Sequence, residues 1–208
     1  MRKLQLLMMA SLILLFVIST SYANSQMIDS INADDLDTSF VTTGGDYGFG
    51  VMTISDFADV SVEWANNSQT TYVGGSFSLI TSLENDNSSG NLAKGLFSGG
   101  TVVVKDGSGA DLLTGEIITM NVVEVFDGFG ILTGAGQFVV TGGLLEPQFA
   151  PAGNVYQLTF EVSPVGLSNF SEDISGRSDV SLTPIPEPAT ICLFGIGAAM
   201  LARKKRKT

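Results

Sequence analysis

Short apolar stretches separated by clusters of Gly, Asn, Asp and Ser fill the middle of the chain, and this pattern constrains the fold more than any other feature. Apolar and polar residues alternate with a period of two in 60–64 and 156–162, as in strands with one buried face. Richer apolar runs at 101–105 and 117–126 flank 106–111, whose composition is typical of a hairpin turn. Helical periodicity nowhere exceeds two turns in this region. We therefore expect an all-β domain, an antiparallel β-sandwich of the jelly-roll kind, with a β-solenoid as the lesser alternative.

The N-terminus has the three parts of a secretory signal peptide. A short basic start, Met1-Arg2-Lys3, precedes a long apolar run from Leu4 to Ile18. Small residues then stand at the −3 and −1 positions of a cleavage between Ala23 and Asn24. The small-residue site favours cleavage over an uncleaved signal anchor, so the mature chain is expected to be exported and to begin at Asn24.

A second apolar segment lies near the C-terminus and is followed by a basic cluster. From Ala189 to Ala202 only Thr190 is polar, and 14 residues of helix would reach about 21 Å against a hydrocarbon core of ~30 Å. Basic side chains next to so short a span can extend outward to the interface. We expect a short C-terminal transmembrane helix whose basic end stays in the cytoplasm. The cluster comprises Arg203, Lys204, Lys205, Arg206 and Lys207.

These features divide the chain into five parts. The segment after 163 is rich in Ser and acidic residues and contains few large apolar ones, which is typical of a flexible linker. The first residues after the signal peptide are also polar. The predicted parts are a signal peptide (1–23), a flexible N-terminus (24–33), a β-sandwich ectodomain (34–163), a flexible stalk (164–183) and a sorting and anchor segment (184–208).

Charge is strongly segregated, and this excludes several classes of function. Residues 24–187 hold all 21 acidic residues but only three of the ten basic ones, so their net charge is −18. Such a surface repels nucleic-acid phosphates. The chain has no histidine and a single cysteine, Cys192. This excludes Ser-His-Asp or Cys-His catalysis, a zinc site rich in His or Cys, and an intrachain disulfide.

Pro186-Glu187-Pro188, the short apolar segment and the terminal basic cluster occur in the order of a known sorting signal. Over about the last 25 residues the chain resembles the PEP-CTERM proteins of Gram-negative bacteria. The resemblance implies that an exosortase, a membrane enzyme usually found alongside exopolysaccharide genes, processes the chain near Pro186, Glu187 and Pro188. It also implies export through the Sec translocon, removal of the leader by signal peptidase, and transient anchoring in the inner membrane with a periplasmic ectodomain. The protein would then reach the cell surface or extracellular matrix.

Oxygen-rich turns raise the possibility of calcium binding. The turn residues 84–90 include Asp86, and 106–111 is bounded by Asp106 and Asp111. Calcium prefers six to eight oxygen ligands, although neither turn has the spacing of an EF-hand loop. The alternative is that Asp, Asn and Gly simply form turns and the carboxylates stay in water. Asp86, Asp106 and Asp111 are the candidate calcium ligands, and no other cofactor is expected. A third acidic group contains Asp34, Asp35 and Asp37.

The residues favour a binding or structural role over catalysis. Tyr47, Phe49 and Trp64 lie beside amides or carboxylates and could contact sugars, although single aromatic residues at strand ends more often pack on a core. With so many acidic residues, a pair at glycosidase spacing is an uninformative signal. We expect no catalytic residues and a non-enzymatic surface or matrix protein associated with exopolysaccharide or biofilm. The alternatives are a small secreted carboxylate-dependent glycan hydrolase and a calcium- or ice/surface-binding adhesin.

Overall fold

A computed structural model describes residues 27–43, 50–125, 131–149, 155–163 and 169–184. The signal peptide, its cleavage site, Tyr47, Phe49, the Pro-Glu-Pro and the basic cluster lie outside these ranges. Among the residues described, no helix is long and apolar enough to cross a membrane. The elements are β1 (Ile28–Thr42), β2 (Gly50–Trp64), β3 (Gln69–Asp86), β4 (Lys94–Lys105), β5 (Asp111–Glu124), β6 (Leu132–Gly142), α2 (Glu146–Phe149), β7 (Val155–Ser163) and β8 (Ile174–Pro184).

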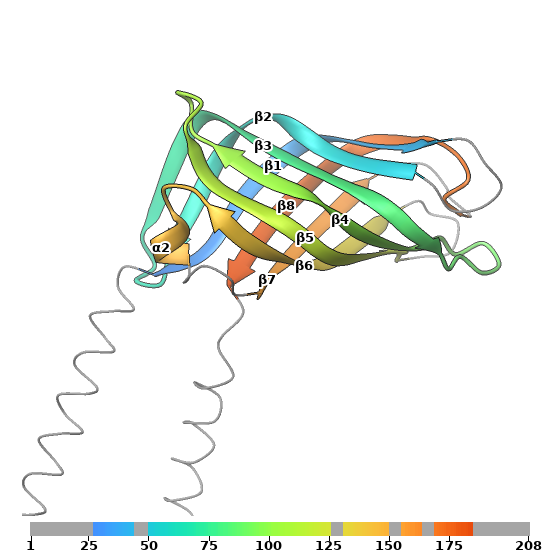
Figure 1. Ribbon diagram of the computed structural model, residues 1–208. Coiled ribbons are helices and arrows are strands. Elements are labelled where there is room, and N and C mark those ends of the chain that lie inside the picture. The colour runs from blue at the N-terminus through green and yellow to red at the C-terminus, as the bar shows by residue number, and fades with distance from the viewer. Residues whose placement is uncertain (1–26, 44–49, 126–130, 150–154, 164–168, 185–208) are drawn as a thin grey trace, which may run out of the picture.

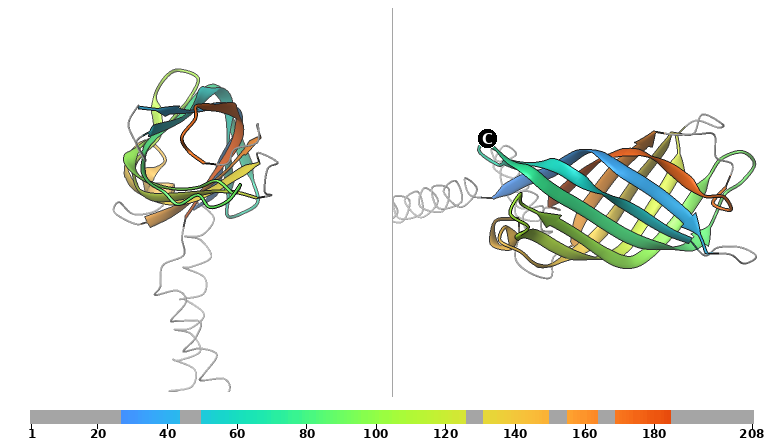
Figure 2. Two further views of the ribbon diagram at one scale, coloured as in Figure 1. Left: turned by 90° about the vertical axis from the view of Figure 1, so that its right-hand side faces the viewer. Right: turned by 90° about the horizontal axis from the view of Figure 1, so that it is seen from above.

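The strands form one antiparallel sheet that closes on itself. Each strand pairs with the next in the chain, and β1 also pairs with β8, from Ile31↔Leu182 to Phe40↔Ile174. Figure 1 shows the strands coiling around a common axis, and the end-on view in Figure 2 shows the ring that they make. The prediction of an antiparallel all-β domain is confirmed. The two-sheet sandwich is corrected to a closed barrel of eight strands, because period-2 alternation is the same whether a sheet packs on a second sheet or on its own far side.

The barrel has two distinct rims. Because neighbouring strands run in opposite directions, β1 begins and β8 ends at the same rim, which we call the terminal rim. The β2–β3 turn, the β4–β5 turn and α2 lie at this rim too (Figure 1). The distal rim carries the β1–β2, β3–β4, β5–β6 and β7–β8 connections. The end of β8 therefore lies at the same rim as these turns.

Inward-pointing apolar side chains fill the barrel. Near the distal rim Phe40, Phe97 and Phe170 pack edge to face, with ring centroids 5.3 to 5.9 Å apart. Towards the terminal rim Phe149 of α2 lies 6.3 Å from Phe138 of β6, and both are fully buried. An eight-stranded barrel is just wide enough for side chains to fill its interior. These rings pack the core close to both rims.

Two of the predicted boundaries need correction. Residues 174–183, assigned to a flexible stalk, lie in β8, and β1 begins at Ile28 inside the segment assigned to a flexible N-terminus. The composition of this part of the predicted stalk resembles that of a linker because the outward positions of β8 carry Ser, Arg and Asp. Its inward positions carry Ile174, Val180 and Leu182, all buried. A strand with one wetted face can therefore have the composition of a linker.

Candidate functional site

The most elaborate polar arrangement on the described surface lies where β1 bulges out of register. β1 pairs with β2 at Ala33↔Val60 and again only at Thr38↔Ile54, so 34–37 lie opposite the longer segment 55–59. Its pairing with β8 is interrupted at the same place. Asp35 has φ = 55°, a left-handed conformation that Asp tolerates better than most residues. The bulge leaves backbone groups of three strands without their usual sheet partners.

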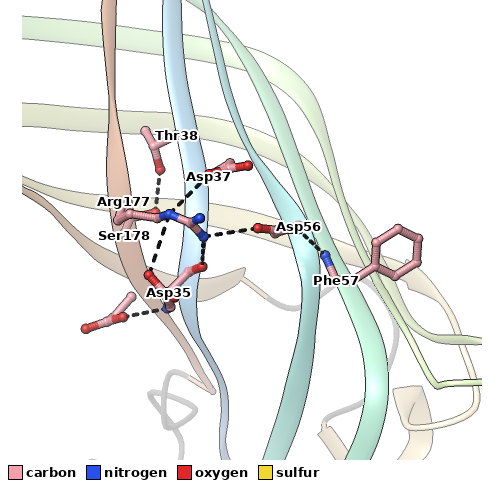
Figure 3. A network of polar contacts seen from close by, with 8 residues as sticks. Asp35, Asp37, Thr38, Asp56, Phe57, Arg177 and Ser178 are labelled. Atoms are coloured by element: carbon pink, nitrogen blue, oxygen red, sulfur yellow. Dashed lines mark hydrogen bonds and ion pairs between the residues drawn. The ribbon is translucent and has the colours of Figure 1, made fainter.

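Arg177 of β8 reaches across β1 and joins the three strands. Its guanidinium donates to the backbone oxygen of Asp35 at 2.7 Å and to the carboxylate of Asp56 at 3.1 Å. Its Nε lies 3.2 Å from the Asp37 carboxylate and 3.6 Å from that of Asp35. Figure 3 shows the guanidinium between these oxygens, with Asp56 approaching from β2. One side chain thus bridges strands that the bulge separates.

Neighbouring polar side chains also replace backbone hydrogen bonds that the bulge removes from the sheet. The Asp35 amide donates to the carboxylate of Asp179 at 2.9 Å. The Phe57 amide donates to the carboxylate of Asp56 at 2.7 Å. Behind them the hydroxyls of Thr38 and Ser178 lie 2.5 Å apart in a buried pair. Backbone amides that the bulge deprives of a ladder partner therefore bond to carboxylates instead.

The network is open to water and has excess negative charge. Asp35, Asp37 and Asp56 contact a single guanidinium, and with Asp179, which accepts from the Asp35 amide, the network has a charge of −3. The Arg177 side chain is 53% exposed, so its ion pairs are screened by solvent. The guanidinium donates to protein oxygens, and the carboxylates around it make the site unattractive to an anion. The arrangement is suited to holding β8, β1 and β2 together.

The three candidate calcium ligands do not form one site. Asp86 pairs with Gly95 at one end of β4, whereas Asp106 follows Lys105 at the other end, beside Asp111. No group of three or more His, Cys, Asp or Glu residues that could hold a metal ion occurs in the described ranges. The Asp111 carboxylate lies 2.8 Å from Lys105 Nζ, and Asp86 accepts the Phe170 amide at 3.1 Å. The hairpin order places the two acidic turns at opposite rims, so Asp86 cannot share an ion with Asp106 and Asp111, and calcium binding at either turn stays a prediction.

Asp106 and Asp173 stabilise the connections near them. Asp106 accepts hydrogen bonds from the Ser108 hydroxyl at 2.7 Å and from the Ser108 and Ala110 amides at 2.8 and 2.9 Å, which lower the pKa of its carboxyl. Asp173 accepts from the amide and hydroxyl of Thr42 at 2.8 and 3.0 Å, and these bonds lower its pKa as well. Asp106 therefore holds its own turn, whereas Asp173 ties the connection before β8 to the end of β1.

The structure also changes which aromatic side chain could meet a ligand. Trp64 packs partly against the core, and its indole donates to the Thr70 hydroxyl at 3.0 Å. Phe57 is 85% exposed on β2, and Figure 3 shows its ring directed away from the Arg177 network. Sequence reasoning missed Phe57, although its period-2 position beside Ser55 and Asp59 could have marked it as outward-facing.

The comparisons with known proteins identify the C-terminal segment. A family model described as the PEP-CTERM protein-sorting motif matches residues 184–207. No curated protein and no solved structure matches the chain. The chain therefore carries a PEP-CTERM sorting motif, as its C-terminal residues predict. This motif marks it as a secreted protein that an exosortase targets, with export and membrane-associated sorting.

Proposed function

We propose that this chain is a non-enzymatic surface or extracellular-matrix protein, processed by an exosortase at its Pro-Glu-Pro and associated with exopolysaccharide. The observation that carries the proposal is the sorting motif over 184–207, which directly follows a closed and filled β-barrel. A barrel packed with apolar side chains offers its outer surface and rims for binding. In this proposal, the sorted protein is an acidic barrel that binds its partners through its outer surface.

The surface favours a particular kind of polysaccharide. Between residues 24 and 187 the net charge is −18, which disfavours contact with an anionic polymer such as a polyuronate. A neutral or cationic glycan meets no such repulsion. Phe57, with the carboxylates of Asp56 and Asp59 as neighbours in the chain, offers an apolar ring beside hydrogen-bond acceptors. Aromatic faces beside polar acceptors suit the apolar faces and hydroxyls of sugar rings.

Sorting is tested in the cell. Replacing Pro186, Glu187 and Pro188 together with alanine should leave uncleaved precursor in the inner membrane, because the processing enzyme loses the residues it recognises. Cell fractionation followed by detection with an antibody to the barrel measures the distribution of precursor and product. Normal processing of the triple variant would refute the assignment.

Glycan association is tested on the processed protein. It should co-sediment with the neutral or cationic fraction of the host's exopolysaccharide, and Phe57→Ala should reduce the bound amount. Val73→Ala, which alters another exposed apolar residue (73% exposed), is a matched control. Failure of the wild-type protein to sediment with any polysaccharide fraction would contradict this part of the proposal.

A further inference from the structure

The sorting motif begins where the barrel ends. β8 runs to Pro184, and only Ile185 separates this residue from the Pro-Glu-Pro. Because a chain spans at most ~3.6 Å per residue, the Cα of Pro186 lies no more than ~7 Å from that of Pro184. A peptidase that binds the Pro-Glu-Pro must therefore work against the terminal rim, where α2 and the β2–β3 and β4–β5 turns also lie (Figure 1).

The last two residues of β8 are held on one side only. Thr183 and Pro184 pair with β7, opposite Gln157 and Tyr156. The ladder between β8 and β1 stops earlier, at Ile31↔Leu182. Proline also has no amide hydrogen to donate to a ladder. The end of β8 is thus paired more weakly than the middle of that strand.

The weakly paired end of β8 does not include Leu182. Its side chain is fully buried, and its backbone is paired with both β1 and β7. Detaching Leu182 as well would expose core surface and break its pairs with both neighbouring strands. This would cost much more free energy than releasing Thr183 and Pro184 alone. Local opening is therefore confined to the last two residues.

A peptidase takes its substrate as an extended chain free of other pairing, so cleavage next to a folded element depends on how often that element opens. We propose that detachment of Thr183 and Pro184 from β7 limits the rate of exosortase processing, so that the barrel end regulates its own release. This inference rests on the proposed sorting function. Detachment gives the enzyme two further residues of free chain, up to ~7 Å more reach.

The test lengthens the tether in the full chain. Inserting Gly-Ser-Gly-Ser between Pro184 and Ile185 should raise the processing rate in a pulse–chase experiment about fivefold, a factor that corresponds to ~1 kcal/mol. The control inserts the same residues between Gly107 and Ser108, in the β4–β5 turn at the same rim, and should leave the rate unchanged. An unchanged or slower rate for the first insertion would overturn the inference.

A second variant tests the pairing itself without changing chain length. Thr183→Gly weakens the pair with Gln157 of β7 and should also speed processing, since glycine is unfavourable in a strand. If this variant is processed at the wild-type rate, detachment is not limiting. The triple alanine variant of the Pro-Glu-Pro separates the two proposals. If it is processed like the wild type, the sorting function itself fails; if it is not, and the insertion has no effect, only the present inference fails.

Discussion

Replacing Arg177 with alanine should destabilise the barrel by about 1–2 kcal/mol at low salt. The substitution removes the contacts of one guanidinium with the carboxylates of Asp37 and Asp56 and with the backbone oxygen of Asp35. Exposed ion pairs contribute about 0.2–1 kcal/mol each, and the 53% exposure of Arg177 places its pairs in that range. The bond to the Asp35 carbonyl adds about 1 kcal/mol, less what water recovers.

The assay is thermal unfolding of the barrel followed by circular dichroism. For a domain of this size, about 1–2 kcal/mol corresponds to a fall in melting temperature of roughly 2–8 °C. The difference should shrink in 1 M sodium chloride, where the screening length is about 3 Å. Arg177→Lys should recover only part of the loss, because an ammonium cannot donate to several oxygens in the fixed geometry of a guanidinium.

Lys94→Ala is the matched control. It removes the same charge from the barrel, and in the described part of the chain Lys94 forms no ion pair within 4.0 Å. Any effect of Lys94→Ala therefore measures the general cost of a more negative surface. Equal shifts for the two variants would refute the view that Arg177 bridges the bulge.

Two further predictions concern packing and acid stability. Phe170→Ala should lower the free energy of unfolding by about 3–5 kcal/mol in a chemical denaturation experiment, because its ring is buried against two others. Phe57→Ala, at an exposed site, should change it by less than about 0.5 kcal/mol. Similar losses for the two variants would mean that Phe170 does not close the distal core. Hydrogen bonds lower the folded-state pKa of Asp106 and Asp173 from the ordinary 3.8, so the stability they contribute is fully present above pH ~4 and is lost as the pH falls through the folded-state pKa. Unfolding measured from pH 5 to pH 2 should show a smaller acid-induced loss in Asp106→Asn than in the wild type, and identical curves would contradict the role of that carboxylate.

The sequence predicts the strands well and their closure poorly. Alternation identifies individual strands such as β2, where Val60 and Val62 point inward, because burial on one face imposes a period of two. The pairing of Ile31 with Leu182 joins residues at opposite ends of the barrel sequence, and no local pattern encodes it. Closure depends on strand number, tilt and register taken together.

The candidate site could be predicted only in part. Asp35 and Asp37 stand out as an acidic group, and Arg177 is one of three basic residues between the two apolar ends. Nothing in their sequence positions indicates that a bulge in β1 brings them together across a third strand. The composition of 164–183 even suggested that Arg177 lies in a linker, because short polar side chains on the wetted face of β8 outnumber its buried apolar ones.

The seam between β1 and β8 sets an order for folding during export. Seven ladders join strands that are consecutive in the chain, and each can form as soon as its second strand has crossed the membrane. The eighth ladder must wait for Leu182, and until then β1 presents an open edge that another chain could pair with. A nascent chain thus stays open to association until β8 forms, just before its sorting motif emerges.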